Sequence, residues 1–214
     1  MDEQARDQAF FSALTTEHFV LQSVSSTTVS ESSSRASLYL MALSSSLVAI
    51  GFAVGVPGAF EPFAGVVLPA IFVLGLFTTV RLVDTAVENI QAQRTIARIR
   101  QHYAELGPEA ARFFGPTRPV LSEQALDMIG VRPGPFLLLF TMASTIGAVN
   151  ALVGRVIVAL AIVAVAGSGA AISAVAIGIA VAAILVLLTV LYQRRRFRLM
   201  DRADQARWGT PGDG

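Results

Sequence analysis

Long runs of apolar residues, separated by short turns and longer polar stretches, dominate the pattern along the chain. A helix needs roughly 20 mostly apolar residues to cross the hydrocarbon core of a bilayer. Two runs of this kind occupy 38–56 and 63–83, and the link between them, "PGAFEP", has the Pro and Gly content of a tight turn. The pattern therefore predicts a first transmembrane hairpin over 38–83, with Pro69 as a kink in its second helix.

The third apolar run, 136–192, is far too long for one transmembrane helix. Its main turn-like interruption is "AGSGA" at 166–170, so we expect the third helix to end there and the fourth to cover 171–192. The predicted fold is all-α, an integral membrane protein with four transmembrane helices in two hairpins.

Polar helices are expected outside the apolar runs. The segment 1–37 predicts an amphipathic helix with Phe11, Leu14, Leu21 and Val24 on one face, and its Ser/Thr-rich end is read as part of that helix. The linker 84–135 should continue the second span to Leu106, where "GP" follows, with an apolar stripe at Ala92, Ile96, Ile99, Tyr103 and Leu106. Two short helices are expected after it, with Phe113 and Phe114 at the membrane surface or a helix contact. An Arg-rich tail occupies 193–214.

Composition agrees with a membrane protein. The chain of 214 residues is 54% hydrophobic and 14% charged, with a mean hydropathy of +0.63, whereas soluble domains carry about 25% charged residues. All 16 basic residues are Arg, and there is no Cys, which excludes disulfides, thiolate metal sites and a cysteine nucleophile. The beginning of the chain lacks the basic and apolar regions of a secretory signal, so the first span should act as its own insertion signal. We expect the lipid bilayer, and no nucleic acid, as a partner.

Orientation follows from the arginines near the ends of the spans. The linker 84–135 and the tail after Tyr192 are rich in Arg, whereas the 57–62 link and "AGSGA" have no basic residue. We therefore expect a multi-pass protein of the cell membrane with both termini cytoplasmic.

Arg155 stands inside the third apolar run and raises the question of its partner. If the second hairpin turns at Ser168, Arg155 lies level with Val181, about 15 Å from the outer end of its helix at 1.5 Å per residue. This depth is near the middle of the membrane. The expected intramembrane polar layer, or ion pathway, consists of Arg155, Asn150, Ser44, Ser45 and Ser46. Alternatives are an anchor that snorkels to the outer interface and polar glue between helices.

Small residues recur every four positions around the fourth span, at Ala166, Ala170, Ala174, Gly178 and Ala182. Such spacing is typical of close helix packing in membranes. The seam could pack against the third span or join two protomers.

Known catalytic and metal-binding patterns do not occur in the sequence. The two histidines, His18 and His102, fit no metal-ligand spacing, and Ser168 in "AGSG" has no intramembrane His as a base. We expect no enzyme activity, no metal and no cofactor.

Two segments carry a resemblance to known proteins. "EHFVLQSVSSTTVSESSSRASLYLMALSSSLVAIGF" and "LPAIFVLGLFTTVRLVD", followed by "RIRQHYAEL", resemble a family of actinobacterial integral membrane proteins that has no assigned activity. In topology the first half is similar to SLATT-type and cyclic-nucleotide-defence membrane effectors, which implies an oligomeric protein that perturbs membranes. The function expected is a non-enzymatic, self-associating membrane protein, as a pore-forming or membrane effector; the alternative is a scaffold subunit of another membrane complex.

Overall fold

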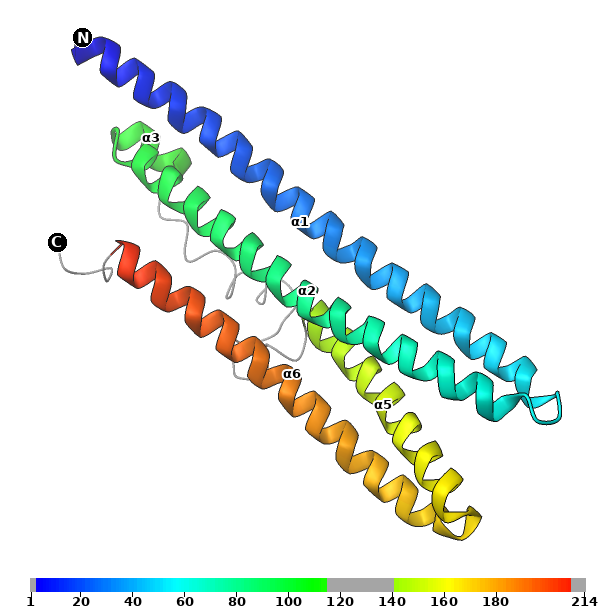
Figure 1. Ribbon diagram of the computed structural model, residues 1–214. Helices are drawn as coiled ribbons and strands as arrows, with labels where there is room; N and C mark the ends of the chain where they lie inside the picture. The colour runs from blue at the N-terminus through cyan, green and yellow to red at the C-terminus, as the bar shows by residue number, and fades with distance from the viewer. Residues whose placement is uncertain (1–2, 115–140, 209–214) are drawn as a thin grey trace. The chain divides into compact units, whose positions relative to one another are not determined.

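The computed structural model describes residues 3–114 and 141–208, and each regular element in these ranges is a helix (Figure 1). The elements are α1 (Glu3–Val54), α2 (Phe60–Ala104), α3 (Pro108–Phe114), α5 (Met142–Ala166), the 3-10 turn η2 (Ser168–Ala170) and α6 (Ala171–Trp208). Within the described residues, four helical segments are long and apolar enough to cross a membrane, namely α1, α2, α5 and α6 with η2. The all-α fold and the four candidate spans are thus confirmed.

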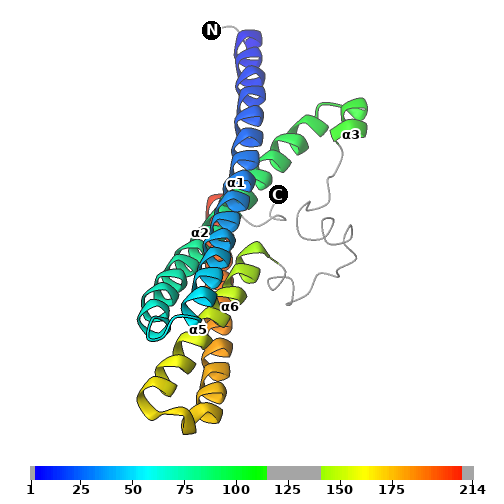
Figure 2. The same cartoon turned by 90° about the vertical axis from the view of Figure 1, so that its right-hand side faces the viewer.

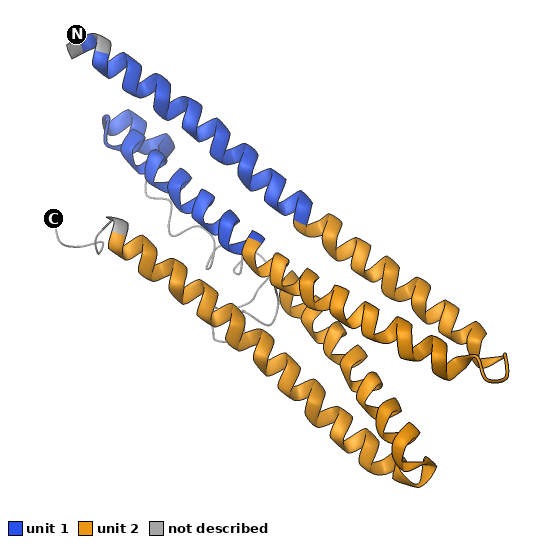
Figure 3. Cartoon of the chain, viewed as in Figure 1, with its two compact units in different colours: residues 1–31, 85–137 blue, residues 32–84, 138–214 orange. Residues whose placement is uncertain are grey.

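Two compact units divide the chain (Figure 3). Unit 1 comprises 1–31 and 85–137, and unit 2 comprises 32–84 and 138–214. The predicted start of the third span and the helix expected after α3 fall at least partly on 115–140, outside the described residues.

Short glycine turns close both hairpins of unit 2. Gly58, between α1 and α2, has a φ of 76°, and Gly167, between α5 and η2, has a φ of 79°. This left-handed region favours glycine because it has no Cβ. Gly167 also donates its backbone N–H to the Val163 carbonyl at 2.9 Å, which caps α5. The division of the long apolar run at "AGSGA" is confirmed, and Figure 2 shows α5 and α6 joined at this end.

The core of unit 2 lies where the four helices face one another. On α1 the inward positions advance by three and four residues, through Ala36, Tyr39, Leu43, Ser46 and Ile50, the spacing of one helix face. α2 adds Ala64, Leu68 and Ile71, and α5 adds Ala143, Ile146 and Val153. Large apolar side chains on the opposite faces, such as Phe52 and Val66, stay exposed, as expected for surfaces that meet lipid.

In unit 1, α1 packs antiparallel to α2, and Thr15 lies 3.3 Å from Tyr103 between their hydroxyl oxygens. In the predicted stripe, Ala92, Ile96 and Ile99 are buried. Two expected contacts are wrong: Leu106 is 56% exposed, because α2 already ends at Ala104, and Val24 is 41% exposed, with Ser25 buried at 7% in its place. The physical reason is that Ser25 lies four residues after Leu21 and stays on the inward face, where its hydroxyl meets Asn89 and Gln93, both at 2.7 Å. α3 places Phe114 against Tyr103, with ring centroids 5.4 Å apart, while Phe113 remains exposed.

Candidate functional site: a buried polar layer and an open groove with one arginine

α5 presents a buried polar face and, at its edge, an open groove. It starts at Thr141, whose hydroxyl accepts a hydrogen bond from the Ser144 N–H at 3.2 Å and caps the helix. Ser144, Gly147, Asn150 and Gly154 then recur every three or four residues and are all buried. Small residues at this spacing let neighbouring helices approach closely in a membrane.

The centre of the buried layer is the contact of Tyr39, Asn150 and Gly75. The Tyr39 hydroxyl donates a hydrogen bond to Asn150 Oδ1 at 3.2 Å and joins α1 to α5. α2 passes at Gly75, where a Cβ would overlap the Asn150 amide and lie 2.8 Å from the Tyr39 ring. Only glycine fits here, because both neighbours are held side chains of the core.

A second polar contact joins α5 to α6. The Gln193 side chain is 0% exposed, and its Nε2 donates to the Ser144 hydroxyl at 3.0 Å. One turn further along α5, a Cβ at Gly147 would lie 2.8 Å from the Thr189 methyl group. These polar groups are therefore occupied with one another, and the layer fixes how the helices of unit 2 pack.

Arg155 lies at the edge of the buried face of α5, on the side towards α6. It follows Val153 of the core by two residues, a rotation of about 200° around the helix, but it follows buried Ala151 by four, a rotation of about 40°. A Cβ at Gly178 of α6 would lie 3.0 Å from Arg155 Cγ. The Arg155 side chain is partly buried, and it makes no hydrogen bond or ion pair with any described residue. It is also close to the middle of the helix, because α5 runs from Met142 to Ala166.

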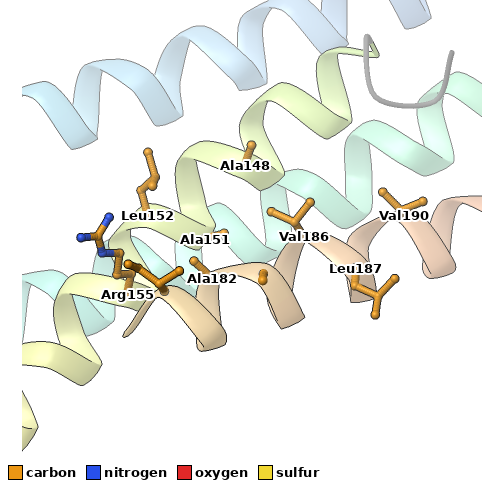
Figure 4. Close-up of a pocket in the computed structure, with 10 residues that line it drawn as sticks. Ala148, Ala151, Leu152, Arg155, Ala182, Val186, Leu187 and Val190 are labelled. Atoms are coloured by element: carbon orange, nitrogen blue, oxygen red, sulfur yellow. The ribbon is translucent and has the colours of Figure 1, made fainter. Parts of the chain in front are cut away.

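The side chain of Arg155 lines an open groove between α5 and α6, which we call the Arg155 groove (Figure 4). One part has a volume of about 640 Å³ and the other, towards η2, about 350 Å³, and Leu152 and Arg155 belong to both. Every other lining residue is apolar, and they include Ala148, Ala151, Leu152, Ile179, Ala182 and Leu187.

The five residues of the predicted polar layer are not brought together. Asn150 lies in the buried layer, and Arg155 lies about 140° further around the helix, in the groove beside α6. On α1, Ser46 is on the inward face, whereas Ser44 and Ser45 are exposed on the outward face. The Ser45 hydroxyl donates to the Met41 carbonyl of its own helix at 2.8 Å.

The predicted small-residue seam lies partly in the contact of α5 with α6. Ala174 and Gly178 are buried, and a Cβ at Gly178 would lie 3.1 Å from the Arg155 carbonyl oxygen. Ala182 is partly buried and lines the Arg155 groove. Ala166, the last residue of α5, is exposed, and Ala170 lies in η2.

An ion pair joins α2 to α6 within unit 2. Asp84 on α2 pairs with Arg196 in the Arg-rich part of α6, with 2.5 Å between Asp84 Oδ1 and an Nη atom of Arg196. Both side chains are partly exposed. One arginine of the tail therefore has a structural role in addition to its contribution to the predicted orientation.

In the described part of the chain, the two histidines contact an amide side chain and aromatic rings. His18 Nε2 lies 3.0 Å from the Gln22 amide nitrogen, and His102 packs edge-on against Phe10 with centroids 5.6 Å apart. Among the described residues, no cluster of three or more acidic, His or Cys side chains could hold a metal ion.

Sequence reasoning missed Tyr39, Gly75, Ser144 and Gln193. The available signal was the spacing Ser144, Gly147, Asn150, Gly154 in "MASTIGAVNALVGRV", which marks a small and polar face on α5. Tyr39 also continues the three-and-four spacing of the inward face of α1.

Comparison with known proteins adds no further assignment, since no protein-family model, curated protein or solved structure matches this chain.

Proposed function

We propose that this is a non-enzymatic integral membrane protein that acts by self-association in the bilayer, as a pore-forming or other membrane effector. The observation that carries the proposal is Arg155, a cation near the middle of a candidate span, with no polar partner among the described residues and apolar neighbours around it. An Arg at a helix centre costs about 2.5–3.5 kcal/mol on insertion scales. A partner from outside the single copy would offset that cost.

The closed buried layer supports the same proposal. In the core of unit 2, Tyr39 bonds to Asn150, and Gln193 bonds to Ser144. A pathway for ions therefore has its best place between copies, where the Arg155 groove opens, rather than through the core of one copy. A ring of Arg in such a place favours anions.

We further propose the cell membrane as the location, with both termini on the cytoplasmic side. The Arg-rich linker and tail support this orientation through the positive-inside rule. The Asp84–Arg196 pair adds support, because Asp84 stands at the start of the Arg-rich linker and Arg196 near the start of the tail. Their contact is consistent with the linker and the tail on the same side of the membrane. Since the chain has no Cys, single cysteines at Gly58 and Arg198 can be tested with an impermeant thiol reagent on intact cells. Labelling at Arg198 but not at Gly58 would overturn the orientation.

The second candidate function is that of an accessory subunit of another membrane complex. Large exposed aromatic side chains in unit 1 favour it, namely Phe10, Phe19 and Phe113. Where such side chains form one contiguous apolar patch, they mark a protein-docking surface.

Counting copies in the membrane tests the main proposal. A fluorescent fusion reconstituted at low density should bleach in several steps, and liposomes that contain the assembled protein should show anion flux. Single-step bleaching at every density, in native membranes as well as liposomes, would exclude self-association. Stoichiometric recovery of one other membrane protein together with single copies of this chain would favour the accessory role.

A further inference from the structure

The polar contact of Tyr39 with Asn150 fixes the relative depth of α1 and α5. Their 3.2 Å hydrogen bond places these two residues at about the same level, and both helices lead from there towards their hairpin turns (Figure 1). Ser44 follows Tyr39 by five residues, and Arg155 follows Asn150 by the same number. At 1.5 Å per residue, Ser44 and Arg155 each lie about 7.5 Å further along. The two therefore stand at nearly equal depth.

Although Ser44 and Arg155 share this depth, neither joins the buried polar layer of its own copy, since Ser44 is exposed and Arg155 is partly buried and lines the groove. Ser44 and Ser45 are exposed on the outward face of α1, between the exposed side chains of Met41 and Val48. In the described part of the chain Ser44 has no hydrogen-bond partner, and Ser45 uses only its hydroxyl proton. The oxygens of both hydroxyls can accept a bond from an Arg N–H.

We propose that the Arg155 groove binds the outward face of α1 of a second copy, where Arg155 donates hydrogen bonds to Ser44 and Ser45 of that copy. The inference rests on the proposed self-association and names its interface. Copies related by rotation about the membrane normal keep the same depth, so the donor of one copy meets the acceptors of the next. Since α1 and the groove are different surfaces, the contact is heterologous, and its repetition closes a ring when the rotation permits.

The chemistry of the groove selects this occupant over lipid. Acyl chains would cover its apolar lining but offer no acceptor to Arg155. The phosphate group of a phospholipid lies at the bilayer surface, about 15 Å from the centre of the hydrocarbon. The outward face of α1 supplies acceptors at the right level together with apolar side chains on either side, and its small serines permit close helix approach.

Cysteine cross-linking in membranes can test the contact without altering the polar groups, because the chain has no Cys of its own. Met41 and Leu152 are the matched positions, each three residues before Ser44 or Arg155 and each exposed. Copies that carry Met41→Cys and copies that carry Leu152→Cys, with different tags, are co-expressed and treated with a short bis-thiol reagent. The control pair is Met41→Cys with Val73→Cys, because Val73 is exposed on α2 near the depth of Leu152, as the Gly75–Asn150 contact shows.

We expect a cross-link between copies for Met41 with Leu152 and not for the control pair. Both Arg155→Leu and the double change Ser44→Ala, Ser45→Ala should weaken the association by about tenfold or more, since each removes hydrogen bonds to a charged group. If bleaching shows several copies but the control pair or Met41 alone cross-links equally well, this interface is refuted and self-association stands. Single copies at every density would refute both proposals. Single copies that retain an anionic lipid, lost in Arg155→Leu, would assign the groove to lipid instead.

Discussion

Gly75 lies so close to Asn150 that a methyl group on its α-carbon would overlap the Asn150 side-chain amide. The first prediction follows from this contact. Gly75→Ala should destabilise unit 2 by about 1–3 kcal/mol, because overpacking forces the core to shift. Denaturant unfolding in detergent measures the change. The matched control is Gly65→Ala on the same helix, where a Cβ meets nothing within 4 Å; there the gain in helix propensity, about 1 kcal/mol, should leave stability equal or higher. Equal effects of the two changes would contradict the close contact.

The second prediction concerns the hydrogen bond from Tyr39 to Asn150. A double-mutant cycle with Tyr39→Phe and Asn150→Ala should give a coupling energy of about 0.6 kcal/mol, the average for such bonds between membrane helices, with about 1.7 kcal/mol as an upper value. The cycle isolates the pair because the separate costs of each truncation cancel. Additive single effects would mean that the bond does not contribute to stability.

A third prediction separates two neighbouring serines of unit 1. Ser25→Ala should destabilise the pairing of α1 with α2, because the partly buried side chains of Asn89 and Gln93 lose their shared partner, at a cost of about 1 kcal/mol. Ser26→Ala is the control, since Ser26 is exposed and bonds only to the Ser23 carbonyl one turn earlier. Hydrogen exchange over 85–104 should rise in the first variant and not in the second. Protection that is unchanged in both would argue against a role for Ser25.

The helices were predictable because their signals are local. Runs of apolar residues and the glycine turns at Gly58 and Gly167 determine where helices begin and end, and each signal lies within a few residues of its effect. The Ser/Thr-rich segment is helical as predicted, and it joins the predicted N-terminal helix and the first span into the single helix α1, with Ser25 and Thr28 buried. There the hydroxyls find partners on α2 or on their own helix.

The site was harder to predict because its residues are joined only by the pairing of helices distant in the chain. Arg155 is evident in the sequence as a single charge within an apolar run, but the sequence does not show which side of α5 meets α6. Asn150 lies five residues before Arg155, about 140° around the helix. It accepts a hydrogen bond from Tyr39, which is 111 residues earlier in the chain. Hydropathy indicates how deep a residue lies in the membrane but not how a helix is rotated about its axis. The sequence therefore predicted that Ser44, Ser45 and Arg155 lie at one depth, but it could not show whether they contact one another.

The fourth prediction concerns the ion pair of Asp84 with Arg196. Both side chains are partly exposed, so Arg196→Gln should lower stability by no more than about 1 kcal/mol. The loss should shrink in high salt, because ions screen exposed charges. Unfolding of the two proteins at low and high ionic strength checks this; a loss of several kcal/mol that salt does not reduce would indicate a buried pair instead.

The last prediction returns to the arginine of the groove. Arg155→Leu should insert normally and keep unit 2 folded, because the residue lies outside the buried polar layer and Leu suits the apolar lining. Its effect should fall on assembly and flux: fewer copies per complex, and anion flux lower than in the wild type. Arg155→Lys keeps the charge but not the planar fork of donors, so its assembly should be intermediate. Stability alone does not decide, since removal of a costly charge and loss of a partner oppose each other. Anion flux that is present in the wild type and unchanged in Arg155→Leu would show that the residue neither lines the pathway nor holds the copies together.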